Sequence, residues 1–398
     1  MKTRFLIWLI ASTLGTASAH AQDALSAQAP PTTRAPGSHG EQRAERLLDL
    51  VEKHSALLAP RDGFGVRVSG IEGGSGFAAG PRWQNSALLG GRARVHASVA
   101  ASITREHEIE GGVTVEDVGT HAVTIRLGAV ARHLADERFA GFGAGSIRAD
   151  QTSFALDQRE ASAAAIVAPA RWLRLTGGAG IVTAEARSGR ARRLPGTFDR
   201  WEAGTLPGLT DHARFATFSL GAVADRRDVP GNPRQGGRYA VSLERYVDRG
   251  RSLQSFRRTS VELEQHFSWW RKQRVLTLRT LGVLSHPDRG HEVPFHLQPT
   301  LGGSRVLRGF VNDRFRDRHM AVVQAEYAWD VWPFLNAVLF YEAGTVAREL
   351  RDMTSRSVKS DYGIGFRLGS ARTIVARTDV AFGSGEGVRL AMRFSHAF

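Results

Sequence analysis

Hydrophobic and polar residues alternate with a period of two along most of the chain, from Phe64 to Phe398. Successive residues of a β-strand point to opposite faces, so this period predicts strands with one apolar face and one polar face. Glycine-rich or charged breaks separate the alternating segments and predict turns. We therefore expect sixteen strands, at residues 64–71, 76–84, 91–103, 105–114, 120–134, 152–168, 171–184, 213–224, 236–247, 255–270, 273–285, 319–330, 335–346, 361–369, 372–382 and 387–398.

The connections between these strands indicate a membrane barrel. Tilted strands of about ten residues can cross a bilayer, and bacterial outer-membrane barrels have short periplasmic turns and longer extracellular loops. With the first strand running outward, the long connections all fall on the outer side: 135–151, 185–212, 286–318 and 347–360. Short connections, such as 169–170 and 330–334, fall on the inner side. The pattern predicts an all-β fold, a sixteen-stranded antiparallel transmembrane β-barrel over residues 61–398.

The last predicted strand shows the alternation clearly. One of its faces carries Val388, Leu390, Met392, Phe394, His396 and Phe398, and the other carries polar or small residues. Apolar side chains outside and polar or small ones inside suit a barrel between lipid and a wet lumen. A terminal phenylalanine after such a strand is similar to the signal by which outer-membrane barrels are recognised for assembly. We expect Leu390, Met392, Phe394 and Phe398 to form that signal.

The N-terminus has the pattern of a secretory signal peptide. Lys2 and Arg4 precede an apolar segment at 5–14, and small residues lead to Ala19-His20-Ala21. This is the order of the charged, apolar and cleavage regions of such a signal. The apolar segment is too short to cross a bilayer as an anchor. We therefore expect cleavage of residues 1–21 during export, and a location in the outer membrane of a Gram-negative bacterium.

Two short regions are predicted between the signal peptide and the barrel. Residues 22–40 are rich in Ala, Pro, Ser and Thr, which predicts a flexible leader. Residues 41–60 predict a short amphipathic helix, at 41–58, whose apolar face would carry Leu47, Leu50, Val51, Leu57 and Leu58. Three roles remain open for this helix: a cap under the barrel mouth, a plug, or a docking site for a partner.

Charge and cysteine content exclude some classes of function. The formal net charge is +14, but the arginines are scattered at alternate strand positions, which argues against nucleic-acid binding. Arginines that line a polar lumen, or face outer-membrane lipid and anionic lipopolysaccharide, explain the excess better. The absence of cysteine excludes disulfides and thiolate metal sites. No apolar segment approaches the about 18 residues of a transmembrane helix.

Two glutamates are predicted to point into the lumen from neighbouring strands. Alternation places Glu326 on the face opposite Tyr327, and Glu342 with Phe340 on the face opposite Tyr341. The tyrosine faces are the apolar, lipid-facing ones, so both carboxylates face inward. A carboxylate held away from bulk water needs a counter-charge, and a guanidinium offers forked, permanently charged donors.

A glycine-rich segment in the longest loop carries a suitable arginine. The segment reads Leu301-Gly302-Gly303-Ser-Arg-Val-Leu-Arg308-Gly309-Phe310. With Glu326-Tyr327 and Phe340-x-Glu342-x-Gly344, it resembles the L-R-G-F, E-Y-R and F-x-D-x-G elements of the BamA/TamA outer-membrane barrel superfamily. The resemblance implies that the loop folds back into the barrel and that Arg308 docks on Glu326 and Glu342. One departure is Glu342, where the family has aspartate.

The resemblance extends to a turn and includes a second departure. Asp225-Arg-Arg-Asp228, followed by Asn232-Pro233 and Gly236-Gly237, resembles the family's D-x-R-D…N-P-x-x-G periplasmic turn. These residue types favour a tight turn, and we interpret the segment as structural. Family members usually carry POTRA modules before the barrel, and the region 22–60 is too short for one complete module.

No enzyme, cofactor or metal site is predicted. Gly302, Gly303 and Gly309 allow positive φ or a close approach to the wall, but the lysine and hydroxyl of a phosphate loop are missing. Four histidines lie in or beside the long loop, without a nucleophile motif or metal-ligand spacing: His286, His291, His296 and His319. We interpret them as ordinary loop residues.

Two functions remain open. Family members insert barrel proteins into the outer membrane or move polypeptides across it, so the resemblance implies an insertase whose partners are unfolded outer-membrane proteins and periplasmic assembly factors. A weakly paired seam between the first and last strands would then expose edges that template a client strand. Gly65 and Gly70 weaken the first strand. The alternative is a passive pore or a structural barrel without insertase activity.

Overall fold

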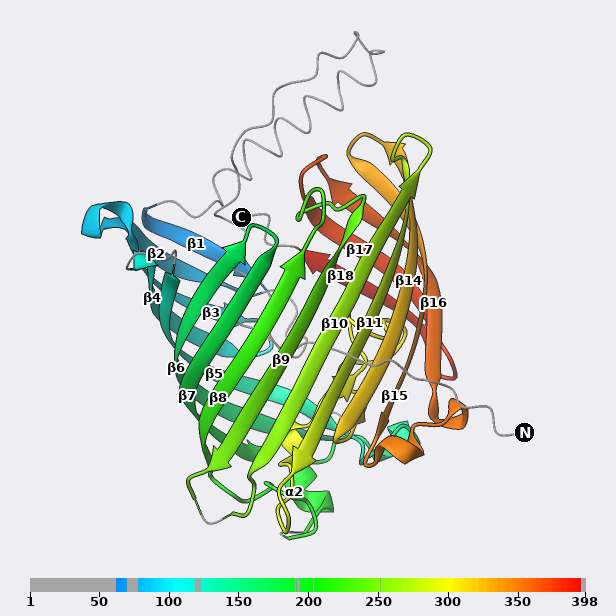
Figure 1. Ribbon diagram of the computed structural model, residues 1–398. Coiled ribbons are helices and arrows are strands. Elements are labelled where there is room, and N and C mark those ends of the chain that lie inside the picture. The colour runs from blue at the N-terminus through cyan, green and yellow to red at the C-terminus, as the bar shows by residue number, and fades with distance from the viewer. Residues whose placement is uncertain are drawn as a thin grey trace.

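The barrel is the part of the chain that the computed structural model describes, through residues 62–69, 78–118, 123–189, 191, 194–202, 204–250 and 252–394. The predicted signal peptide, leader and amphipathic helix lie outside these residues, as do Gly70 and Phe398. Sixteen strands form one antiparallel sheet in sequence order, and the sheet curves into a barrel (Figure 1). All sixteen predicted strands are present, so the predicted fold class is confirmed.

The elements have the following bounds. The barrel strands are β1 (Gly63–Ser69), β2 (Ala78–Leu88), β3 (Ala93–Ser102), β4 (His107–Val118), β5 (Val123–Phe139), β6 (Thr152–Ala170), β7 (Leu173–Ser188), β8 (Ala213–Asp225), β9 (Gly236–Asp248), β10 (Phe256–Trp269), β11 (Arg274–Pro287), β14 (His319–Trp332), β15 (Leu335–Ala347), β16 (Lys359–Gly369), β17 (Ile374–Gly383) and β18 (Gly387–Phe394). The connections contain β12 (Thr300–Leu301), β13 (Phe315–Arg316), α2 (Thr197–Arg200), and 3-10 turns η3 (Leu89–Gly91), η4 (Arg148–Asp150), η5 (Phe295–Leu297), η6 (Leu350–Asp352) and η7 (Ser355–Ser357).

The structure differs from the sequence prediction on the outer side of the barrel. Strands β5, β6 and β7 have 17, 19 and 16 residues, more than the about ten that a tilted membrane strand needs. The outer ends of β5 and β7 extend into segments that were predicted as loops, and their residues Phe139 and Ala186 pack there with apolar side chains from other connections. β6 begins at Thr152, as predicted, and extends instead at its inner end. The predicted loop 286–318 is also not wholly irregular, since β12 and β13 pair within it.

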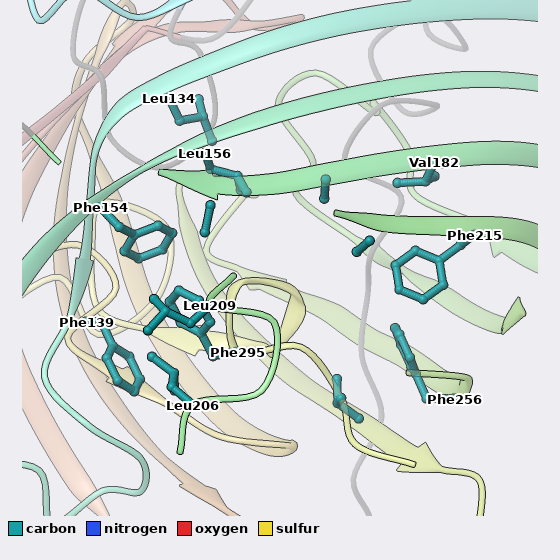
Figure 2. Close-up of a cluster of buried hydrophobic side chains, with 14 of the residues drawn as sticks. Leu134, Phe139, Phe154, Leu156, Val182, Leu206, Leu209, Phe215, Phe256 and Phe295 are labelled. Atoms are coloured by element: carbon teal, nitrogen blue, oxygen red, sulfur yellow. The ribbon is translucent and has the colours of Figure 1, made fainter. Parts of the chain in front are cut away.

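An apolar cluster fills the outer end of the barrel. Phe139 and Phe154 from the β5 and β6 ends pack against Phe295, with ring centroids 5.2 and 4.8 Å apart. Figure 2 shows Leu206 and Leu209, from the connection between β7 and β8, beside these rings. Three connections distant in sequence thus share one small core at the outer mouth.

The faces of the strands follow the predicted alternation. Leu339 and Tyr341 are 49% and 54% exposed on the outside of β15. Glu342, the next residue along the strand, points to the opposite face and is fully buried inside the barrel. Leu390 and Met392 are likewise exposed on β18. The two ends of the sheet, β1 and β18, are not joined to each other by a β-ladder within the described residues.

Candidate functional site in the lumen

The connection between β11 and β14 folds back into the barrel, as predicted. Its β12 and β13 form a small hairpin that is anchored by apolar contacts: Leu301, Leu307, Phe310 and Phe315 are at most 2% exposed. They pack against inward residues of the wall strands in a second apolar cluster. Burial of these side chains offsets the entropy lost in ordering a long loop.

Two glycines shape the turn that follows β12, inside this hairpin. Gly302 and Gly303 have φ of +110° and +117°, which side-chain-bearing residues rarely adopt. A Cβ on Gly302 would also lie 2.2 Å from the carbonyl oxygen of Val311. The tight turn lets the following residues run along the inner face of the barrel wall, and Phe310 fixes this course by packing edge-on against Phe315 at 5.3 Å.

Arg308 lies at the point where the loop meets the wall. Its Nη2 is 2.7 Å from Glu326 Oε1 and 2.8 Å from Glu342 Oε1. Its Nε and its backbone N–H both donate to Glu342, at 2.9 and 2.8 Å. The guanidinium also lies 3.7 Å over the ring of Phe340. The contacts expected from the sequence, between the loop arginine and the two lumen glutamates, are therefore present.

The longer side chain of Glu342, where the resembled family has aspartate, still reaches the arginine. Its carboxylate is fully buried, and the arginine side chain is 3% exposed. Gly344 follows on the same face of β15, where a Cβ would meet the Ala321 carbonyl oxygen at 2.8 Å and Leu301 at 3.3 Å. The glycine thus leaves room for the hairpin to lie against β15.

Sequence reasoning missed three partners on β16 and β17. Asp379 accepts hydrogen bonds from Arg308 Nη1 at 3.2 Å and from Arg367 Nη1 at 2.6 Å. Arg367 also forms a salt bridge with Glu326 at 3.3 Å. Asp361 accepts the backbone N–H of Gly309 at 2.6 Å. Strand alternation puts all three on the lumen face, but it does not say which of many lumen charges the loop would meet.

The electrostatics of the site favour a permanently charged arginine. Burial alone would lower the pKa of the Arg308 guanidinium, but the carboxylates of Glu326, Glu342 and Asp379 outweigh burial and raise this pKa above its ordinary value. A buried charge is tolerated only when it is paired and hydrogen-bonded. The arrangement is suited to clamp a loop on the wall.

Close packing at Gly309 leaves no room for a bound phosphate. A Cβ on this residue would lie 2.5 Å from the backbone nitrogen of Gly383 and 2.8 Å from Asp361. The glycine backbone therefore lies directly on β16 and β17. Together with Arg308, it ties the loop to four successive wall strands, β14 to β17.

The histidines of the long loop do not converge on a common ligand. His296 is buried beside Phe295, whereas the ring of His286 contacts that of His319 at a tilt of 51°, with centroids 4.9 Å apart. Among the described residues, no group of three or more His, Asp or Glu side chains could hold a metal ion. In the same part of the chain, no helix has the length and apolarity needed to cross a membrane.

The predicted periplasmic turn, residues 226–235, reaches further than its sequence indicates. Asn232 Nδ2 donates to the carbonyl of Ser370 at 2.8 Å, and the N–H of Ile374 donates to the carbonyl of Gly231 at 3.2 Å. Arg234 is 2.7 Å from Asp330 at the inner end of β14. This connection between β8 and β9 therefore extends along the inner rim to the turn between β16 and β17.

The predicted assembly signal is only partly within the described side chains. Leu390 and Met392 are 63% and 57% exposed and lie on the lipid-facing side of β18. The side chain of Phe394 and the whole of Phe398 lie outside the described residues. The signalling role stays a prediction.

These features define an outer-membrane β-barrel whose longest loop is docked in its lumen. A family model, the Omp85 superfamily domain, matches residues 149–395. This match covers more than half of the chain, and the protein belongs to the Omp85 superfamily.

Solved structures share the fold at low sequence identity. The chain is similar to BamA from Haemophilus ducreyi lacking POTRA domains 1–3, with 13% identity and a TM-score of 0.63 over 84% of this chain and 70% of that one. It is also similar to CdiB from Escherichia coli, with 12% identity and a TM-score of 0.53 over 84% and 63% of the two chains. CdiB from Acinetobacter baumannii is 10% identical, with a TM-score of 0.50 over 83% of this chain and 58% of that one. The chain thus spans less than two thirds of either CdiB structure. A search of curated proteins found no match.

Proposed function

We propose that this protein assists the insertion of other β-barrel proteins into the outer membrane. Its partners would be unfolded outer-membrane proteins, with periplasmic assembly factors delivering them and outer-membrane lipid surrounding the barrel. The proposed mechanism involves no covalent chemistry and no cofactor. An open strand edge offers unpaired N–H and C=O groups, and a client strand can pair with that edge.

The observation that carries the proposal is the position of the docked loop. Arg308 and Gly309 tie β14, β15, β16 and β17 together through buried contacts, and these are the strands that precede β18. The edge strand β18 pairs with β17 on one side, and its other side forms no ladder with β1 within the described residues. A braced wall beside a free edge would let the seam open while the rest of the barrel keeps its shape.

The alternative is a passive pore or a structural barrel. The apolar cluster around Phe295 occupies the outer mouth (Figure 2), and the docked loop occupies part of the lumen. Both features disfavour a wide, permanently open channel. Conductance in planar bilayers would distinguish a pore from an insertase, since an insertase of this kind needs no steady ion current.

The test compares liposomes that carry the purified mature barrel with liposomes that carry an unrelated outer-membrane barrel. A small urea-unfolded outer-membrane protein is added, and its folding is followed by heat-modifiable migration. We expect faster folding with this protein, and a loss of most of the acceleration with Arg308→Ala but not with Arg305→Ala, whose side chain is exposed. Equal rates with this protein and the unrelated barrel would reject the proposal.

A further inference from the structure

An arginine row lies on the outside of the barrel near the outer ends of β8 to β10. Arg245 and Arg257 are directly opposed in the β9–β10 ladder, and Phe218 is opposite Arg245 in the β8–β9 ladder. Arg257 is in turn opposite His286 on β11. Opposed like charges on neighbouring strands repel each other, so this row is destabilising unless an anion lies against it.

The arginine row faces the membrane, at the edge of its apolar region. Leu243 is two residues before Arg245 on the same face of β9 and is 50% exposed. Phe218 and Leu220 are 54% and 64% exposed on the face of β8 that also carries Arg214. Side chains two residues apart on a strand share a face, so the row sits directly beyond the lipid-facing apolar band. This is the depth of the outer-leaflet headgroups.

Two loop arginines enlarge the row into a patch. The backbone N–H of Arg249 donates to the carbonyl of Arg214 at 2.7 Å, and Arg289 follows Asp288 beyond β11. We call these five residues the outer arginine patch: Arg214, Arg245, Arg249, Arg257 and Arg289. All except the partly exposed Arg245 are exposed.

The patch has too few carboxylates to neutralise it. Asp288 binds Arg245 through two hydrogen bonds of 2.7 and 2.6 Å. The nearby Asp248 uses its two oxygens to accept backbone N–H groups of its own loop, from Gly250, Ser252 and Gln254. The other four arginines of the patch form no salt bridge with any residue in the described part of the chain.

The corresponding region on β5 to β7 is different. There Arg187 forms salt bridges with Glu185 at 3.1 Å and with Asp157 at 3.0 Å. Asp157 also lies 2.6 Å from Nδ1 of His133. Protein carboxylates thus pair with Arg187 and His133 on that side of the barrel. The arginines of the outer patch lie on and beside β8–β11, which form the front of the barrel in Figure 1.

We propose that the outer arginine patch binds the phosphate groups of lipopolysaccharide in the outer leaflet. Guanidinium groups recognise phosphates through paired, charge-assisted hydrogen bonds, and the apolar residues beside them would contact the acyl chains. The partner is a lipid with several phosphates close together, which matches a row of arginines better than a headgroup with one phosphate. This inference concerns the outer surface and does not depend on the proposed insertase function.

The experiment measures binding of bisphosphorylated lipid A to the full-length mature protein in neutral detergent micelles. The test variant carries Arg214→Gln, Arg257→Gln and Arg289→Gln. The control variant loses the same number of charges at the inner rim, through Arg171→Gln, Arg271→Gln and Arg372→Gln, all at exposed positions. We expect the test variant, which loses three interfacial arginines, to bind lipid A about a hundredfold more weakly, and the control to bind as wild type does.

Two further arms keep the result decisive. Phosphatidylglycerol and dephosphorylated lipid A replace the probe, and both should bind wild type more weakly than bisphosphorylated lipid A. Equal binding by the test variant and wild type, or equal binding of phosphatidylglycerol and lipid A, would overturn the proposal. Should the triple variant fail to show heat-modifiable folding, Arg257→Gln alone is measured, and an unchanged affinity there rejects the proposal as well.

Discussion

Glu342 holds both the side chain and the main chain of Arg308. One carboxylate oxygen accepts from the guanidinium at 2.9 Å and the other accepts the backbone N–H at 2.8 Å. The double contact fixes the direction of the loop as well as its charge partner. A lysine at this position would retain a positive charge but lose the forked geometry that also reaches Glu326 and Asp379.

Removal of the arginine should undock the loop. In Arg308→Ala, the buried carboxylates of Glu342 and Asp379 and the partly buried one of Glu326 lose their shared cation. Loss of one partner of a buried ion pair costs about 3–5 kcal/mol. We expect chymotrypsin, whose aromatic and leucine sites in the 288–318 connection are the same in both proteins, to cut that connection faster in the folded variant barrel. We also expect the heat-modifiable form to unfold at a lower temperature in gel shift assays.

Arg305→Ala is the matched control for this prediction. Arg305 lies in the same loop but its side chain is exposed, so its loss should change neither readout. Glu342→Gln adds a second check, because its effect should be strongly non-additive with that of Arg308→Ala. Additive effects of the two substitutions would show that the residues do not act through their mutual contact.

A methyl group at Gly309 should also disturb docking without removing any charge. The Cβ of Gly309→Ala would lie 2.5 Å from the backbone nitrogen of Gly383, so the loop must move away from the wall. Overpacking of this kind costs about 1–3 kcal/mol. Proteolysis of the same loop should increase, whereas Gly145→Ala, which has nothing within 4 Å of its Cβ, should behave as wild type. Unchanged proteolysis in both variants would contradict this packing.

The sequence predicted the barrel well because its signals are local. Period-two alternation and turn residues place each strand within a few residues of its observed bounds, as for the predicted strand 335–346 and the observed β15 (Leu335–Ala347). The largest errors lie at strand ends: β5 and β7 continue for several residues on the outer side, and β2 and β4 do so on the inner side. The outer extensions depend on packing against connections that are distant in sequence, and alternation within one segment carries no information about them.

The site was predicted in part for the same reason. Glu326 and Glu342 could be assigned to the lumen by alternation, and the family resemblance paired them with Arg308. Asp361 and Asp379 have the same lumen-facing parity, but nothing local distinguishes them from other inward charges. Their contact with the loop arises from the curvature of the sheet, which brings β16 and β17 around to Gly309.

Acid should loosen the outer end of the loop through His296. Burial, with a smaller effect of the nearby Arg316, lowers the pKa of this imidazole to about 3 from its ordinary 6.5. The unfolded loop therefore binds a proton as pH falls through 6.5 while the docked loop does not, so docking loses stability as pH falls. Between pH 7.5 and 5.0 the loss is about 2 kcal/mol from this group. Limited proteolysis at the two pH values measures it.

His296→Gln isolates this effect from other titrating groups. Glu106, in the turn between β3 and β4, has the opposite sign: burial and nearby Asp136 raise its pKa to about 7, so its contribution to stability is lost as pH rises from about 4.5 to 7. Wild type and His296→Gln both keep Glu106, so the difference between their pH profiles of proteolysis reports His296 alone. Parallel profiles for wild type and His296→Gln would show that His296 does not sense pH.

The contact between Asn232 and Ser370 should protect the turn between β16 and β17. In Asn232→Ala the Ser370 carbonyl loses its amide donor, a loss of about 1 kcal/mol. The 226–235 connection should then open more often, and amide exchange at Ile374, whose N–H donates to Gly231, should accelerate about fivefold. Arg226→Ala is the control, since that side chain is exposed and lies 4.3 Å over Trp172 instead. Equal acceleration in both variants would mean that the connection is loosened generally and that the link to β16–β17 is not specific to Asn232.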